Sequence, residues 1–198
     1  MTKVLLVRHG ETDWNREGRV QGRTDILLNH RGVKQAEYCR RALKDMTFDC
    51  VVSSPLARAR ETAAFIAGPR QIIVEDAFIE RHYGMAEGLT IEECRQSYPD
   101  RRYPYEETLF AMQERVMRGL HKLHEEYLEQ KVLVVTHGGV INGVLAFVTK
   151  GTYGSGKTRL SHGGLTDLEC IDGHWIVHQF NVVNHLDSKE INLSNEKR

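Results

Sequence analysis

Residues 3–12, KVLLVRHGET, join a run of apolar side chains directly to a group of polar ones. Residues 3–7 are expected to form a strand; after Lys3 they are all apolar and do not alternate with polar residues, which is typical of a strand covered on both faces of a sheet. Arg8 and His9 follow it without a break. The stretch therefore predicts a buried strand of a parallel sheet, with two basic side chains at its carboxyl end.

The rest of the chain alternates apolar runs of strand length with helical patterns. Strands are expected at 49–53, 71–75 and 131–136, and helices at 31–46, 57–67, 106–129 and 140–147. Two last strands, at 165–171 and 174–181, are joined by an Asp172-Gly173 turn, which is typical of a hairpin. This order predicts an α/β fold with three layers, α/β/α, and a mostly parallel sheet with an antiparallel edge strand.

Composition and charge are those of a globular protein without a strong field. The 27 Lys and Arg residues balance the 27 Asp and Glu residues, so the chain has no net charge that would attract nucleic acid or an anionic membrane. No apolar run approaches the roughly 18 residues that span a bilayer, and residues 1–7 are too short for a signal peptide. We therefore expect a cytoplasmic protein that binds neither nucleic acid nor membrane.

The four cysteines are scattered and form no Cys-x-x-Cys pair; they are Cys39, Cys50, Cys94 and Cys170. A chain of 198 residues can build a core of its own without disulfides. The sequence therefore indicates reduced thiols, as in a cytoplasmic protein.

Polar residues follow three of the expected strands. They are Arg8-His9, residues 53–55 (SSP) and His137-Gly138. In open α/β sheets, ligands bind beyond the carboxyl ends of the strands. Side chains that are far apart in the sequence should therefore meet at one edge of the sheet.

The side chains expected at this edge suit phosphoryl transfer without a metal, which needs a nucleophile, fixed cations and an acid. The guanidinium groups of Arg8 and Arg58 offer planar forks that match phosphate oxygens. Two such charges beside His9 would also lower its pKa and keep a nitrogen lone pair available for attack. Glycines beside the two histidines allow backbone N–H groups to approach an anion; they are Gly10, Gly138 and Gly139.

The pattern Leu-x-Arg-His-Gly-Glu-Thr-x-x-Asn at residues 6–15 resembles the signature of the histidine phosphatase superfamily, also called the phosphoglycerate mutase-like family. Further blocks match in the same order; they are Gly22 and residues 27–36, 53–63, 80–88 and 135–139. The resemblance spans nearly the whole chain, and in length and layout it is closest to small bacterial broad-specificity phosphatases. It implies a single histidine phosphatase domain over residues 1–186, with a polar tail at 187–198.

The resemblance also implies roles for individual residues. His9 would be the nucleophile that forms phosphohistidine, and Glu80 would be the proton donor and later the base. The phosphoryl oxygens would be held by Arg8, Arg58, His137 and Asn15. The substrate side would be lined by Gly10, Gln21, Gly22, Arg81, His82, Tyr83 and Gly138. The resemblance implies a small-molecule phosphate ester as the partner, no metal and no cofactor, and a monomer or homodimer.

Residues 80–84, ERHYG, are shared with the cofactor-dependent phosphoglycerate mutases, so a mutase is an alternative. Those mutases place a lysine shortly after this motif, where this chain has Ile91, and a Trp-Arg-Arg segment that Arg101-Arg102 imitates only in part. Each charge-assisted hydrogen bond that is missing would weaken binding of a doubly phosphorylated cofactor by roughly 1.5–3 kcal/mol. We therefore expect hydrolysis. An inactive regulatory module of the same fold is disfavoured because all five chemical positions are filled.

Two other patterns suggest sites that we do not expect. Residues 151–158, GTYGSGKT, match the P-loop pattern, but a P-loop follows a strand and opens a helix, whereas a helix is expected before this segment. A glycine-rich loop is the favoured interpretation. His121 and His124 share a helix face, yet the sequence supplies no carboxylate partner for a metal site.

Overall fold

The computed structural model describes residues 1–187, and the polar tail expected at 187–198 lies outside them except for Asp187. Within these residues, strands form one six-stranded sheet in the order β3-β2-β4-β1-β5-β6. Their bounds are β1 Thr2–Arg8, β2 Cys50–Ser53, β3 Ile73–Val74, β4 Lys131–Thr136, β5 Leu165–Ile171 and β6 His174–Val182. The first four strands run parallel, and β5 and β6 are antiparallel to their neighbours. The predicted sheet is confirmed.

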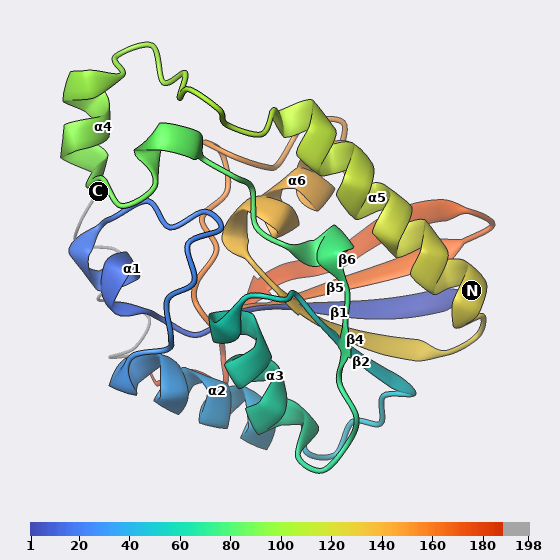
Figure 1. The fold of residues 1–198 in the computed structure, drawn as a ribbon. Helices are drawn as coiled ribbons and strands as arrows, with labels where there is room; N and C mark the ends of the chain where they lie inside the picture. The colour runs from blue at the N-terminus through green and yellow to red at the C-terminus, as the bar shows by residue number, and fades with distance from the viewer. Residues whose placement is uncertain (188–198) are drawn as a thin grey trace.

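Helices cover both faces of the sheet. Figure 1 shows α2 (His30–Ala42) and α3 (Ala57–Ala67) on one face, with α5 (Leu109–Glu126) and α6 (Gly138–Val148) on the other. The three-layer arrangement that the alternating pattern predicts is therefore present. Shorter elements lie in the connections; they are α1 (Asp13–Glu17), η1 (Asp76–Phe78), η2 (Gly84–Ala86) and α4 (Ile91–Ser97).

Strand β1 lies in the middle of the sheet and its apolar side chains serve both faces. Val4 and Leu6 pack in the core beneath α5 and α6, whereas Leu5 and Val7 pack in the core against α2 and α3. Successive side chains of a strand point to opposite faces, so a strand that is covered on both sides must be apolar throughout. This explains why residues 4–7 show no alternation.

Several predicted boundaries change. The helix expected over 31–46 ends at Ala42, and the strand expected over 71–75 is reduced to Ile73–Val74. The long helix begins at Leu109 because Thr108 caps it, accepting a hydrogen bond from the Ala111 backbone N–H. The expected hairpin is confirmed, since Asp172 and Gly173 both have positive φ, as a two-residue type I′ turn requires.

Candidate active site

The carboxyl ends of β1, β2 and β4 bring the expected polar residues together. The His9 backbone N–H donates to the carbonyl of Thr136 at 2.9 Å, and that of Ser54 donates to the carbonyl of Val135 at 3.0 Å. The ring centroids of His9 and His137 lie 5.1 Å apart. Parallel pairing therefore carries residues from three distant parts of the sequence to one edge, as the sequence predicts.

His9 is buried, with 3% of its surface exposed. Its Nδ1 lies 2.6 Å from the carbonyl oxygen of Gly10. A carbonyl oxygen only accepts hydrogen bonds, so Nδ1 carries the proton and the lone pair is on Nε2. Burial lowers the pKa of His9 well below its ordinary value, and the charges of Arg58 and Arg8 lower it further. His9 is thus a neutral imidazole in the tautomer that leaves Nε2 able to attack.

Arg58, in the first turn of α3, is a buried guanidinium with 1% exposure. Nη1 donates to the carbonyl of Thr24 at 3.0 Å and Nη2 to that of Gly22 at 2.7 Å, but Nε has no hydrogen-bond partner among residues 1–187. Burial lowers the pKa of Arg58, while the carboxylates of Glu80 and Asp25 act in the opposite direction. A guanidinium keeps its charge in proteins, so an anion is the natural complement of the open donor.

His137 is fully buried and precedes the first turn of α6. Its Nε2 lies 2.6 Å from Ser54 Oγ, which also accepts a hydrogen bond from the Leu56 backbone N–H at 3.3 Å. The Ser54 hydroxyl can donate to Nε2, and in that tautomer Nδ1 carries the single ring proton of the neutral imidazole. Nδ1 has no partner within residues 1–187, and burial, followed by the charge of Arg58, lowers the pKa of His137 well below its usual value. His137 is a second neutral donor beside His9.

Arg8 ends β1 and lies against the start of α6. Its Nη1 donates to the carbonyl of Leu160, and its backbone pairs with Gly163 and Gly164. A methyl group at Gly138 would come within 3.2 Å of Arg8 Nε, so glycine at this position leaves room for the guanidinium beside the helix N-terminus. The sequence correctly predicts that Arg8 and the residues after β4 lie close together.

Glu80 follows η1 and has 9% exposure. One carboxylate oxygen accepts a hydrogen bond from the Gly139 backbone N–H at 3.0 Å, and the other accepts one from the Arg81 backbone N–H at 2.8 Å. A methyl group at Gly139 would overlap with Glu80 Oε1, so only glycine lets the carboxylate approach α6 this closely. An acid is thereby placed at the same helix N-terminus as His137.

A neutral imidazole with an unprotonated Nε2, two arginines, a second histidine and a carboxylate thus share one edge of the sheet. The family model described as histidine phosphatase superfamily (branch 1) matches residues 4–183. The chain belongs to this superfamily. The resemblance noted in the sequence is confirmed.

Relatives of this histidine phosphatase are themselves named phosphatases. The uncharacterized phosphatase PhoE of Bacillus subtilis is 43% identical over 188 residues, 94% of this chain and 97% of that protein. A metal-independent phosphoserine phosphatase of Arabidopsis thaliana is 32% identical, over 95% of this chain and 84% of its own length. A phosphoserine phosphatase variant of Entamoeba histolytica, solved with phosphoserine, superposes with a TM-score of 0.85 at 29% identity, covering 94% of this chain and all of that one. The chain is a phosphatase that hydrolyses phosphomonoesters.

Three of the residues expected to contact the substrate have polar groups that this histidine phosphatase already uses. Asn15 Oδ1 accepts hydrogen bonds from the backbone and hydroxyl of Thr12 in the capping box of α1, which leaves its amide N–H groups as donors. The Gly10 N–H donates to Thr62 Oγ1 at 3.1 Å, and the Gly22 carbonyl receives Arg58. Gln21, in contrast, is buried with an Oε1 that has no partner in the described part of the chain.

Within the segment from Arg81 to Tyr83, the side chains of Arg81 and His82 contact residues 105–107, whereas that of Tyr83 lies near Glu80. The Arg81 guanidinium donates to Glu106 and to the Glu107 carbonyl, each at 2.7 Å, and His82 Nδ1 bonds to the Tyr105 carbonyl. Burial raises the pKa of Tyr83, and the nearby Glu80 carboxylate raises it further. The Tyr83 side chain is therefore near the Glu80 carboxylate, which the Arg81 backbone N–H also contacts.

Sequence reasoning missed His162, whose ring centroid lies 5.7 Å from that of His9 and which is 9% exposed. Its position before a Gly-Gly pair gives no recognisable spacing to His9 or His137. It also missed the ion pair between Glu107 and Arg115, which joins the segment before the long helix to the helix itself. Such pairs are set by tertiary contacts rather than by any local pattern.

The P-loop match at 151–158 has the wrong surroundings. It follows the C-terminus of α6 and precedes β5, whereas a P-loop links a strand to a following helix. Lys157 Nζ folds back onto the carbonyl of Gly151. Within residues 1–187, no three His, Cys, Asp or Glu side chains gather as a metal site would need, and no helix is long and apolar enough to cross a membrane. The four cysteines are buried and free.

Proposed function

We propose that this enzyme hydrolyses small-molecule phosphomonoesters through a phosphohistidine on Nε2 of His9. One observation carries the proposal: beside a neutral, buried His9 lie two buried nitrogen donors, Arg58 Nε and His137 Nδ1, with no partner among residues 1–187. Buried donors in proteins are nearly always satisfied. The oxygens of a phosphoryl group next to His9 would satisfy both.

In the first step, Nε2 of His9 attacks phosphorus and the bond from phosphorus to the ester oxygen breaks. Arg8, Arg58 and His137 hold the phosphoryl oxygens, with the amide of Asn15 as a further donor. The leaving alkoxide takes the proton of Glu80, which is held at Gly139 in reach of this edge. The products are the free alcohol, phosphohistidine and the Glu80 carboxylate.

In the second step, the Glu80 carboxylate takes a proton from water while the water oxygen attacks phosphorus. The bond between phosphorus and Nε2 breaks, inorganic phosphate leaves, and His9 returns to its neutral state. Glu80 is protonated again, so the cycle closes. No step calls for a metal or a cofactor.

Gln21, Gly22 and Tyr83 are the residues we propose for the alcohol side of the substrate. Phosphoserine is the first substrate to test, because a relative and a structural neighbour carry that name. 3-Phosphoglycerate, a ribazole phosphate and aryl or sugar esters complete the panel, compared by kcat/KM. We further propose that the enzyme is cytoplasmic, acts as a monomer or homodimer, and binds neither nucleic acid nor membrane.

The reaction is tested with purified protein, p-nitrophenyl phosphate and 3-phosphoglycerate, in EDTA and without added 2,3-bisphosphoglycerate. We expect release of inorganic phosphate from both esters. Cofactor-dependent interconversion of 2- and 3-phosphoglycerate with little phosphate release would instead identify a mutase. A folded protein that turns over no ester of the panel would be a binding module.

The nucleophile is tested by replacing His9 with alanine. We expect kcat to fall by a factor on the order of 10⁴ or more, because nothing else at this edge can form the covalent intermediate. The matched control is His121→Ala, a substitution of an exposed histidine on α5, which should keep full activity. Quenching the wild-type protein with labelled substrate should trap an acid-labile phosphohistidine that His9→Ala lacks. Activity that survived the His9 substitution would refute the assignment.

A further inference from the structure

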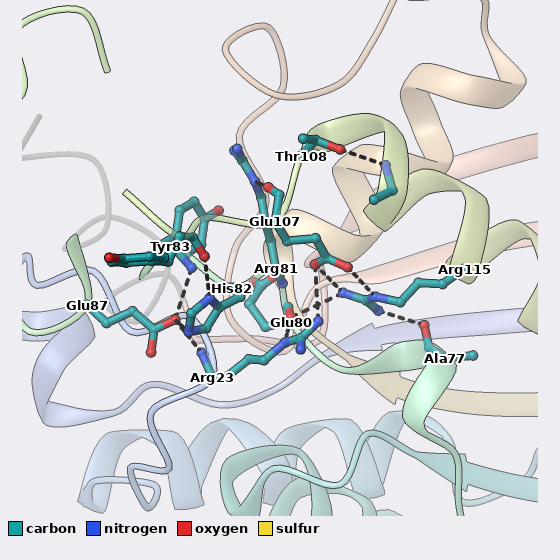
Figure 2. A network of polar contacts seen from close by, with 12 residues as sticks. Arg23, Ala77, Glu80, Arg81, His82, Tyr83, Glu87, Glu107, Thr108 and Arg115 are labelled. Atoms are coloured by element: carbon teal, nitrogen blue, oxygen red, sulfur yellow. Dashed lines mark hydrogen bonds and ion pairs between the residues drawn. The ribbon is translucent and has the colours of Figure 1, made fainter. Parts of the chain in front are cut away.

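Glu80 is held by its main chain as well as by its carboxylate. Its backbone carbonyl oxygen accepts a hydrogen bond from Arg23 Nε at 3.2 Å and another from Arg115 Nη2 at 3.2 Å (Figure 2). Two guanidinium groups on one carbonyl fix the peptide from which the acid side chain extends. No regular strand or helix holds this residue, so these contacts replace the backbone ladder that positions His9.

Both guanidinium groups converge on the carboxylate of Glu107. Arg115 binds it in a bidentate manner, with Nε and Nη2 each 2.8 Å from a carboxylate oxygen. Arg23 Nη2 lies 3.3 Å from Glu107 Oε2. A bidentate pair fixes direction as well as distance, because two parallel N–H···O bonds form only when the fork and the carboxylate are aligned. Glu107 therefore orients the two groups that hold the Glu80 carbonyl.

The same residues hold the chain on both sides of Glu80. Arg115 Nη1 donates to the carbonyl of Ala77 at 2.9 Å, and the Glu107 backbone N–H donates to the carbonyl of His82 at 2.8 Å. Arg115 lies on α5 and Glu107 lies just before its N-cap, so the start of this helix acts as a rigid support. The backbone from 77 to 82 is pinned at three carbonyls to that support.

The opposite charges of Glu107 and of Arg115 and Arg23 hold these three side chains together near neutral pH. The side chains of Glu107 and Arg115 are 13% and 16% exposed. Burial alone would raise the pKa of Glu107, but the hydrogen bond and charge of Arg115, with the charge of Arg23, outweigh it and lower the pKa. Glu107 is thus favoured as an anion between the two cations Arg115 and Arg23.

We propose that Glu107 and Arg115, with Arg23, are positioning residues for the acid Glu80. This inference rests on the proposed role of Glu80. A carboxylate that must protonate a leaving oxygen has to be placed within a fraction of an ångström, and displacement of about 1 Å can cost on the order of 100-fold in rate. We expect loss of these contacts to displace the proton donor more than the nucleophile half of the site, whose backbone is fixed by the sheet.

The leaving group distinguishes this role from a purely structural one. p-Nitrophenolate is a stable anion that leaves without a proton, whereas the alkoxide of benzyl phosphate, a substrate of similar shape, must be protonated as it departs. We compare kcat/KM, which reports the phosphorylation step, for these two esters. Glu80→Gln should lower the value for benzyl phosphate by about 10²–10⁴-fold and that for p-nitrophenyl phosphate far less.

Glu107→Gln should reproduce this selective loss on a smaller scale. We expect about 10- to 100-fold lower kcat/KM for benzyl phosphate and a change within about threefold for p-nitrophenyl phosphate. In the Glu80→Gln background the same substitution should cause no further loss. The matched control is Glu75→Gln, which removes the 2.7 Å ion pair between Glu75, just before η1, and Lys122 on α5. This substitution should leave kcat/KM unchanged for both esters.

An equal loss for both esters in Glu107→Gln would overturn the inference and leave Glu107 a structural residue. Arg115→Lys keeps the charge but not the fork, so it tests the same idea if Glu107→Gln fails to fold; it should show the same selective loss. If Glu80→Gln itself discriminates poorly between the esters, the proposed role of Glu80 fails first. In the other outcome, Glu80→Gln lowers kcat/KM selectively for benzyl phosphate but Glu107→Gln lowers it equally for both esters. That result overturns only the inference about Glu107.

Discussion

The two halves of the site are held in different ways. His9 and His137 stand at the ends of central strands, and backbone hydrogen bonds of the sheet place them. Glu80 lies in an irregular connection between β3 and α4, and side-chain charges place it. One half is rigid because of topology, and the other is rigid because Glu107 holds two arginines.

The two halves should therefore be vulnerable to different changes. Substitutions on the nucleophile side should act through charge and hydrogen bonding to the phosphoryl group, since the backbone there is fixed by the sheet. Substitutions on the acid side should act through position, since a small shift of the connection moves the carboxylate. Beyond His9 and Glu80 themselves, further substitutions can break or sharpen this distinction, and among them the largest effect is expected at Arg58.

Arg58→Lys tests the nucleophile half. Lysine keeps the charge but cannot make the fork that now binds the carbonyls of Thr24 and Gly22 and leaves Nε for an anion. We expect kcat/KM to fall about 10²–10³-fold, because charge-assisted hydrogen bonds contribute roughly 1.5–3 kcal/mol each. The loss should be equal for p-nitrophenyl and benzyl phosphate. A loss confined to the alkyl ester would show that Arg58 acts through Glu80 and would break the comparison.

Gly139→Ala tests the point where the two halves meet. The new methyl group would overlap with Glu80 Oε1 and must push the carboxylate away. We expect roughly 10- to 100-fold lower kcat/KM for benzyl phosphate. p-Nitrophenyl phosphate should be affected much less. The control is Phe147→Ala, because the Phe147 side chain is exposed elsewhere on α6. Gly143→Ala is not suitable because Met112 occupies the space that a methyl group would need. Equal loss for both esters would mean that the helix itself had shifted.

The pH dependence of stability tests the neutral histidines. In the unfolded chain His9 and His137 take up protons as the pH falls below about 6.5, whereas their folded-state pKa values lie well below that. The free energy of unfolding should therefore be level above pH 7 and fall below pH 6.5, by up to about 1.4 kcal/mol per pH unit for each histidine. Urea denaturation between pH 5 and 7.5 measures this slope. His9→Gln should remove about half of the contribution; an unchanged slope would contradict it.

Lys157→Ala should have the smallest effect. The lysine is exposed, and its Nζ contacts the Gly151 carbonyl within the same loop. We expect kcat/KM within about twofold of wild type and a stability change within about 0.5 kcal/mol. The measurement is repeated with ATP present. A clear loss of activity or a stabilisation by ATP would give the glycine-rich loop the function that its surroundings argue against.

The sequence predicts the nucleophile half well because its signals are local. Strand-length apolar runs end at Arg8, Ser53 and Thr136, and parallel strands necessarily share one carboxyl edge. The bounds expected for the second helix, 57–67, agree with α3. These features follow from periodicity and from the residue that ends each run.

The acid half is predicted poorly because its contacts are long-range. Arg115 reaches Glu80 from 35 residues away, and no periodicity links them. Helix α4 is not predicted although Thr90 and Glu93 form a capping box, a pattern that is visible in sequence; the helix is simply short. Helix α1 is capped by Thr12 with Asn15 in the position usually taken by Glu or Gln, so its signal is weaker.

The central place of β1 has a consequence for how the protein comes to be folded. Residue 4 pairs with residue 132 on one side and residue 168 on the other, so β1 can complete its pairing only after β4 and β5 have been made. Pairings this distant in sequence slow folding because loop closure precedes any gain. We expect a chain truncated before residue 160 to carry the His9 motif yet lack the backbone groups of Leu160, Gly163 and Gly164 that hold Arg8 beside it. Residues that are distant in sequence therefore complete the surroundings of His9.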